Sequence, residues 1–124
     1  MSNQFLVVGS PIDHSKSPAI HRAAYRVLGL DWDYGKLEVG RGGLRQVVDN
    51  APEALRGFSV TMPLKEVAFD VADEVTPVAV LARAINTLII DDTIRADNTD
   101  VLVIVNAVRE MTSHPINHAV IFGS

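Results

Sequence analysis

The stretch that most constrains the fold is a short apolar run that ends in glycine and leads through a polar loop into a helix. Residues 5–9 read Phe-Leu-Val-Val-Gly, which is typical of a buried parallel strand. Pro18 begins a helix whose apolar residues recur at helical spacing until Gly29. Free N–H groups and the positive end of the helix dipole meet at such a helix start, so this corner favours an anion such as a carboxylate.

The polar residues of this corner also have a purely structural interpretation. Ser15 and Ser17 lie on either side of Lys16, and Ser17 directly precedes Pro18. Serine at the N-cap followed by proline at the first helical position is a common helix start, so Ser17 is expected to be the N-cap residue. On this stretch alone both interpretations stay open.

Strand and helix patterns alternate along the rest of the chain. The predicted strands are 32–39, 57–61 and 118–122, the predicted helices are 44–55, 63–71, 77–83 and 101–111, and a β-hairpin is predicted near 86–97. This order predicts an α/β fold with a mostly parallel mixed sheet flanked by helices. Since ligands bind where the strands of such sheets end, the polar clusters after these strands are expected to form one composite site.

Lys65 and Asp100 are the candidates for proton transfer. Lys65 would lie in the first turn of the helix begun by Pro63, where the helix dipole disfavours a cation and lowers its pKa. Asp100 would lie in the first turn of the last helix, where the dipole favours a carboxylate. The two side chains could form a proton relay. Alternatively, Lys65 could be a solvated lysine that pairs with Asp70 or Glu66, and the sole role of Asp100 could be to stabilise its own helix.

Thr61 and Asn86 each have a binding and a structural interpretation. Thr61 could line the site or cap the helix begun by Pro63, and Asn86 could offer a donor and an acceptor or be a turn residue. His14 and His21 have no recognised metal-ligand spacing, and the sequence contains no cysteine, so we predict no metal site.

Composition narrows the class of protein. A hydrophobic fraction of 48% in 124 residues suits one domain with a core. A net charge of −4 and a pI near 5.4 argue against a nucleic-acid-binding surface. The apolar runs are shorter than a membrane span, and the first residues do not resemble a signal peptide, so we expect a cytoplasmic protein.

Four motifs, in this order and at these spacings, together resemble the shikimate dehydrogenase family. They are GSPIDHSKSP at 9–18 with His21, SVTMPLK at 59–65, AINTL at 84–88 and DNTD at 97–100. The resemblance implies that residues 1–117 are the substrate-binding amino-terminal domain of that enzyme. The family reduces 3-dehydroshikimate to shikimate with NADPH, on the route to chorismate and the aromatic amino acids.

The resemblance also implies roles for the candidate residues. The side chains that would hold the substrate are Ser15 and Ser17 at its carboxylate and Thr61, Asn86 and Asp100 at its ring hydroxyls. Lys65, with Asp100 as its partner, would donate or accept the proton at the reacting oxygen. Hydride transfer would belong to the nicotinamide.

The end of the chain is expected to lead into a second domain. A strand that ends at a glycine is how a dinucleotide-binding unit begins, so residues 118–124 are predicted to be its first strand and loop start, with Gly123 near the cofactor. The resemblance then implies that the NADP-binding domain lies outside this chain. The chain alone would be inactive, and its exposed domain face could form a homodimer.

Three departures from the family pattern leave the substrate and the cofactor open. The family usually has glycine where Arg83 and Val103 stand, and commonly asparagine where Ser59 stands. These changes are compatible with a paralogue that acts on quinate, with NAD in place of NADP. The sequence is also compatible with a stand-alone module that binds shikimate without catalysis, and with an unrelated α/β fold whose polar loop ends are ordinary helix caps.

Overall fold

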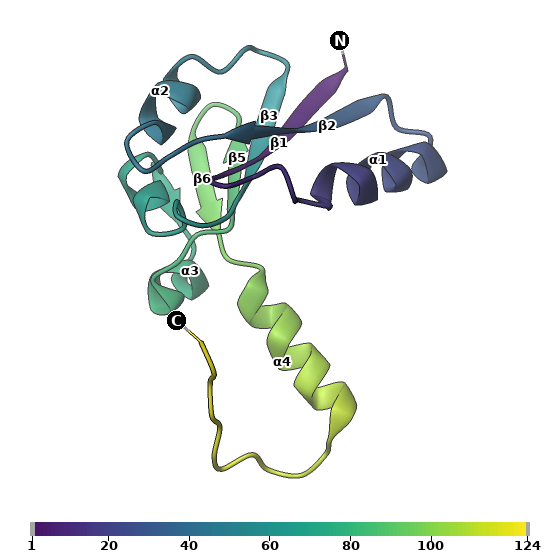
Figure 1. The fold of residues 1–124 in the computed structure, drawn as a ribbon, viewed down its shortest axis with the longest axis vertical. Helices are drawn as coiled ribbons and strands as arrows, with labels where there is room; N and C mark the ends of the chain where they lie inside the picture. Colours follow the sequence, from purple (N-terminus) through teal and green to yellow (C-terminus); the bar gives the residue numbers. More distant parts are fainter. Residues whose placement is uncertain (1, 124) are drawn as a thin grey trace.

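The computed structural model describes residues 2–123 and contains a six-stranded sheet with helices on both faces (Figure 1). The strands are β1 (Asn3–Gly9), β2 (Trp32–Glu38), β3 (Leu55–Val60), β4 (Glu74–Val75), β5 (Thr87–Ile90) and β6 (Ile94–Asp97). The helices are α1 (Ser17–Leu28), α2 (Leu44–Asp49), the 3₁₀ helix η1 (Val67–Asp70), α3 (Pro77–Ala82) and α4 (Asp100–Met111). The predicted α/β class, the mixed sheet and the hairpin are confirmed.

The sheet order β2-β1-β3-β5-β6-β4 explains why distant motifs meet. β1 pairs in parallel with β2 and β3, so all three end at the same edge, which we call the site edge. β5 runs antiparallel to β3 and therefore begins at the site edge, whereas β6 runs antiparallel to β5 and ends there. The polar segments after β1, β3 and β6 and before β5 are thereby brought to one edge.

The two faces of the sheet bury different side chains because successive strand residues point to opposite sides. Val8 and Val60 face the main core, which they share with α2, η1 and α3. Val7 and Tyr34 face a smaller cluster beside α1. α1 packs mainly against β2, so the part of this face formed by β3 and β5 is less covered.

Two predicted helices are shorter in the structure. The helix predicted for 44–55 ends at Asp49, and Leu55 instead begins β3, because a turn in which the Leu55 N–H donates to Pro52 O separates the two elements. The helix predicted for 63–71 is a pair of turns followed by η1. In this segment the Leu64 N–H donates to Thr61 O, and these turns bury the apolar residues without a full α-helix.

The strand predicted for 118–122 is not formed, because residues 112–123 have no regular secondary structure. A strand needs a neighbour to satisfy its backbone groups, whereas Ile121 and Phe122 are about 90% exposed here. The assignment of 118–124 to a second domain stays a prediction, and Ser124 lies outside the described residues. Among residues 2–123, no helix is long and apolar enough to span a bilayer.

Candidate functional site

The first part of the site is the corner between β1 and α1. Thr61, just after β3, lies against Gly9 at the end of β1, and its N–H donates to Val8 O at 2.9 Å. A Cβ on Gly9 would lie 2.4 Å from Thr61 Cγ2 and 2.7 Å from Met62 O. Glycine is therefore needed at position 9 for this close approach, which sets Thr61 beside the loop that carries the two serines.

The start of α1 differs by one residue from the prediction. The helix begins at Ser17 with Lys16 as its N-cap residue, so the prediction that Ser17 is the N-cap was wrong. Ser15 Oγ accepts a hydrogen bond from the Ser17 N–H at 3.3 Å and so satisfies the first free N–H group of the helix. Because the helix starts one residue earlier than expected, the Ser17 hydroxyl is not used for capping.

His21 and Tyr34 hold the Ser17 end of this corner. The His21 ring stacks on the Tyr34 ring, with centroids 4.0 Å apart and planes 11° apart, and His21 Nδ1 lies 2.8 Å from Ser17 O. The Tyr34 hydroxyl donates to Ser59 Oγ at 2.5 Å. Ser59 is paired across the sheet with Thr87, so this group of side chains extends from α1 to β5.

Lys65 and Asp100 meet, as predicted. Lys65 Nζ donates to Asp100 Oδ2 at 2.6 Å, and both side chains are partly exposed and open to a ligand. Lys65 lies in a turn before η1 and not in the first turn of a helix, so the predicted effect of a helix dipole on Lys65 is not supported. Its place is fixed by the backbone, because the Ile85 N–H donates to Lys65 O at 2.8 Å.

Asp100 has the electrostatic environment of a paired carboxylate. The hydrogen bond from Lys65 lowers the pKa of Asp100, and the charge of Lys65 and a hydrogen bond from Asn86 add to this effect, against partial burial, which raises it. Asp100 therefore stays ionised near neutral pH. A hydroxyl or carbonyl oxygen brought to the pair would meet a cationic donor and an anionic acceptor side by side.

Asn86 connects β5 to the start of α4. Its Nδ2 donates to Thr99 Oγ1 at 2.8 Å, while its Oδ1 accepts from the Thr99 N–H at 3.0 Å and from Thr87 Oγ1 at 2.9 Å. Asn86 thus uses both its donor and its acceptor, as predicted, but its partners in the structure are protein groups. Asn86 holds the loop that carries Asp100 in place.

Four residues of this network were missing from the predicted set. Tyr34 lies inside a predicted strand and had no motif signal, whereas Thr99 belongs to the DNTD motif but received no role. Ser59 begins the SVTMPLK motif and was otherwise noticed only as a departure from the family pattern. Asn98, which is 5% exposed, donates from Nδ2 to Ala84 O and accepts the Val101 N–H at Oδ1. Its position three residues before Val101 is a capping signature that could have identified it.

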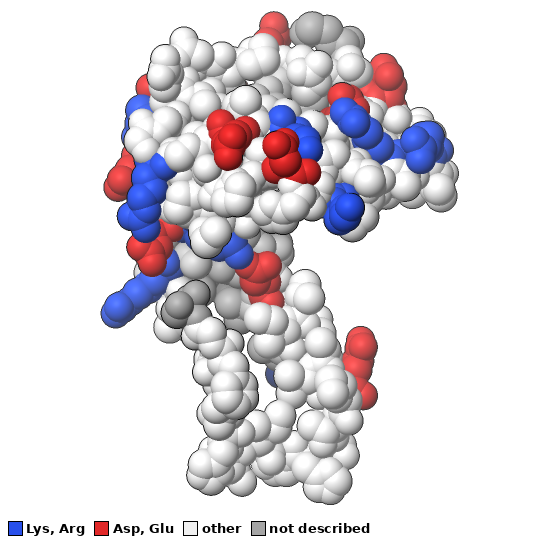
Figure 2. Space-filling model, in the orientation of Figure 1, with Lys and Arg blue, Asp and Glu red and all other residues white. Residues whose placement is uncertain are grey.

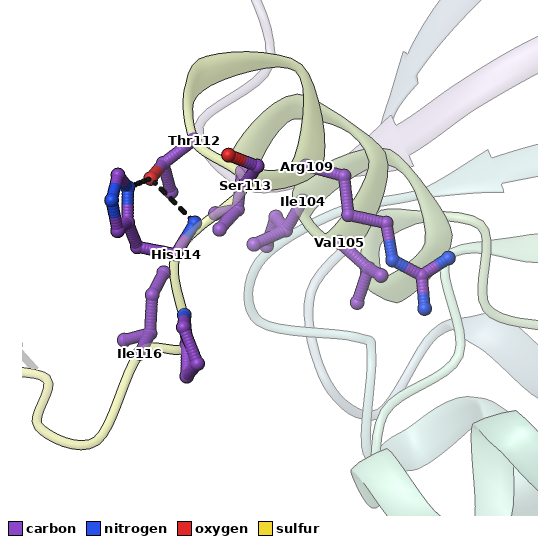
Figure 3. A pocket seen from close by; sticks show the side chains of 9 residues that line it. Ile104, Val105, Arg109, Thr112, Ser113, His114 and Ile116 are labelled. Carbon is purple, nitrogen blue, oxygen red and sulfur yellow. Dashed lines mark hydrogen bonds between the residues drawn. The ribbon is translucent and has the colours of Figure 1, made fainter.

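Hollows in the surface lie at both ends of this network. One, of about 750 Å³, is lined by Thr61, Lys65 and neighbouring residues. Another, of about 540 Å³, is lined by aromatic rings, Ser59 and Thr87 on the less covered sheet face. A third, of about 570 Å³, lies between α4 and residues 112–116 (Figure 3), and none of the predicted site residues lines it.

Gly123 does not form part of a dinucleotide site with the described residues. Its φ is 107°, a conformation that favours glycine, but a Cβ built there would have no neighbour among them within 4 Å. It is preceded by irregular chain and not by a strand. The residues that this structure describes therefore do not fit a bound dinucleotide, and its contact with Gly123 stays a prediction.

Arg83 occupies a position that suits glycine. It is the C-cap residue of α3, with φ 54° and ψ 31° in the left-handed region, as is Gly29 after α1. A side chain in this conformation costs about 1–2 kcal/mol relative to the right-handed region. This backbone conformation explains why the family that the sequence resembles usually has glycine where this chain has Arg83.

Comparisons with known proteins agree on one family. Residues 7–88 match the shikimate dehydrogenase substrate binding domain. The NADP(+) shikimate dehydrogenase of Methanothermobacter thermautotrophicus is 37% identical over 95% of this chain and 42% of its own length. The crystal structure of Mycobacterium tuberculosis shikimate dehydrogenase is 45% identical with a TM-score of 0.81, over 86% of this chain and 42% of that one.

A ligand-bound relative shows the same similarity. The structure of Listeria monocytogenes shikimate 5-dehydrogenase in complex with shikimate and NAD is 35% identical with a TM-score of 0.83, over 89% of this chain and 39% of that one. The chain thus spans about two fifths of the length of these relatives.

Proposed function

Since the chain belongs to the family of shikimate dehydrogenase substrate-binding domains, we propose that it is the substrate-binding part of an NADP-dependent shikimate dehydrogenase. The enzyme would reduce 3-dehydroshikimate reversibly to shikimate, in the formation of chorismate and the aromatic amino acids. The observation that carries the proposal is the Lys65–Asp100 pair, at 2.6 Å, which lies at the same sheet edge as Ser15 and Ser17.

The two ends of the site suit the two ends of such a substrate. Ser15 and Ser17 lie at the start of a twelve-residue helix, where hydroxyls, N–H groups and the helix dipole favour the carboxylate. Thr61 and Asn86 lie toward the other end, where ring hydroxyls need both donors and acceptors. The proposal assigns these four side chains to substrate binding.

The chemical role in this proposal is a proton transfer. Lys65 donates a proton to the carbonyl oxygen of 3-dehydroshikimate as that carbon is reduced, and accepts the hydroxyl proton in the reverse direction. Asp100 stays ionised, orients the Lys65 ammonium group and accepts a hydrogen bond from a neighbouring ring hydroxyl. The hydride comes from NADPH bound outside the described residues, so this chain by itself is expected to bind the substrate without turning it over.

Calorimetric titration of the chain with shikimate tests the proposal. Saturable binding is expected, and Asp100→Asn and Lys65→Met should each weaken it about tenfold or more, the equivalent of one charge-assisted hydrogen bond. Asp49→Asn is the matched control, because Asp49 forms an exposed ion pair with Arg45 away from the site. A folded protein that does not bind at millimolar shikimate would contradict the proposal.

Two further expectations can be tested with the same protein. Quinate titrated in parallel distinguishes the paralogue, since tighter binding of quinate than of shikimate would reassign the substrate. We also propose a cytoplasmic location and a homodimer, which cell fractionation and light scattering test. A monomer at all concentrations would exclude the dimer.

A further inference from the structure

Tyr34 is a buried polar residue that the proposed mechanism does not use. It is 2% exposed and lies on β2, with its ring stacked on His21. Its hydroxyl donates to Ser59 Oγ at 2.5 Å, a short contact between two hydroxyls. A phenol in this position must satisfy its oxygen with protein partners, since burying an unpaired hydroxyl is costly.

Ser17 is connected to this phenol through the His21 ring. Burial raises the pKa of Tyr34, and the nearby hydroxyls of Ser59 and Ser17 lower it. The backbone of Ser17 is held as well, because His21 Nδ1 lies 2.8 Å from Ser17 O. Tyr34 thus supports the backbone of Ser17 through the His21 ring on which it stacks, and its own hydroxyl lies near that of Ser17.

We propose that Tyr34 is a positioning residue that links Ser59 to Ser17 in a chain of three hydroxyls directed at the substrate carboxylate. The inference rests on the proposed function, in which Ser17 binds that carboxylate. A hydroxyl can rotate between donating and accepting. When an anion binds, Ser59 donates to Tyr34, Tyr34 donates to Ser17, and Ser17 donates to the carboxylate.

The direction of the three hydrogen bonds determines how strongly these hydroxyls stabilise a bound anion. Each hydroxyl that accepts a hydrogen bond becomes a better donor, so an aligned chain stabilises a negative charge at its end more than Ser17 alone would. Without the anion, the hydrogen bond from Tyr34 to Ser59 can form as it does in the structure. The three hydroxyls therefore favour binding of a charged ligand group over a neutral one of similar shape.

Tyr34→Phe tests this, because it keeps the ring and its stacking on His21 but removes the hydroxyl. We expect shikimate binding to weaken about tenfold, corresponding to one lost hydrogen bond to a group that contacts a charge. Ser59→Ala should weaken it less, since the first link alone is lost. Binding of the neutral methyl ester of shikimate should change less than about twofold in both variants.

Tyr25→Phe is the matched control. Tyr25 lies on α1, packs against Phe5 and Trp32, and lines the same cavity as Tyr34. Tyr25→Phe therefore removes a tyrosine hydroxyl from this cavity without touching the proposed series of three hydroxyls. We expect unchanged affinity for shikimate. Equal losses for shikimate and its methyl ester in Tyr34→Phe, or no loss for either, would overturn the proposal.

A measurement without ligand separates this proposal from the proposed function. The Hα–Hβ coupling constants of Ser17 report its side-chain rotamer in solution. We expect one fixed rotamer in the unmodified chain and averaging in Tyr34→Phe. Fixed coupling constants in both proteins would overturn the positioning role, even if shikimate binds. A rotamer that depends on Tyr34 in a chain that does not bind shikimate would instead support the positioning of Ser17 and contradict the proposed function.

Discussion

The sheet and its packed helices differ sharply from α4 and the chain that follows it. The first region, residues 2–99, contains the buried apolar side chains of both core clusters. In the second, residues 100–123, none of the described residues is fully buried, and apolar ones such as Leu102 and Ile104 are 62% exposed. α4 projects away from the sheet (Figure 1), and its visible surface carries few charges (Figure 2).

The difference shows which part of the site supports itself. Ser15, Ser17, Thr61, Lys65 and Asn86 are placed by a sheet with its own core. Asp100 belongs to α4, which is held by the hydrogen bonds of Asn86 and Asn98 and by Lys65. The acidic partner in the proposed proton transfer therefore depends on polar contacts, whereas the rest of the site depends on apolar packing.

The largest expected contrast is in stability. Leu88→Ala should lower the free energy of unfolding by about 2–5 kcal/mol, because it opens a cavity at a side chain that is 1% exposed. Leu102→Ala on α4 should change it by no more than about 0.5 kcal/mol. Urea unfolding followed by circular dichroism measures both. Similar losses would show that α4 is packed in solution and would remove the contrast.

A second contrast lies inside the sheet region. Gly9→Ala should destabilise the protein by about 1–3 kcal/mol, because the new methyl group collides with Thr61 and with the backbone of Met62. Gly42→Ala is the control, since a Cβ built there has no described neighbour within 4 Å. Chemical unfolding of the two variants tests this. A neutral Gly9→Ala would mean that β1 and the segment after β3 separate easily.

The third prediction concerns Arg83, where α3 ends. Arg83→Gly should raise the stability by about 1 kcal/mol, because it relieves a left-handed backbone. Arg26→Gly, in the last turn of α1, should instead lower it by about 0.5–1 kcal/mol, because glycine loses more chain entropy in a helix. Thermal unfolding compares the signs. The same sign for both would rule out strain at Arg83.

The smallest effect is expected where α4 meets the sheet region. Lys65→Met should raise the pKa of Asp100 toward the ordinary value of an aspartate, because the main cause of its lowered pKa is removed. A carboxyl group with a lowered folded pKa stabilises the protein above its unfolded pKa, and this stabilisation is lost as the pH falls through the folded pKa.

Both side chains of the pair are substantially exposed, so the contribution should stay below about 1 kcal/mol. Carbon-detected NMR titration of the Asp100 carboxyl group measures the shift. Asp91 provides an internal control, because its pKa is lowered by Thr93 and Arg95, away from Lys65. An Asp100 titration that does not respond to Lys65→Met would show that the pair is open in solution.

Local patterns predicted most of the elements. The apolar run before Gly9, the Thr76–Pro77 helix start and the hairpin carry signals within a few residues, and all three are found. The predictions that were wrong extended a helix through Pro52, began a full helix at Pro63, or placed a strand at 118–122. In these cases the sequence pattern shows only which residues are apolar. The turns and the neighbouring strands determine whether those residues form a helix, a strand or neither.

For the site, the sequence by itself determined the chemical groups and their order: two serines before a helix, a lysine after one strand and an aspartate at the start of the last helix. Only the tertiary structure decided that Lys65 and Asp100 touch, that Ser15 accepts a hydrogen bond from the first N–H of α1, and that Tyr34 joins Ser59 near Ser17. The physical reason is that these contacts join strands through the order and direction of the sheet, which many distant apolar contacts set together and which spacing along the chain does not encode.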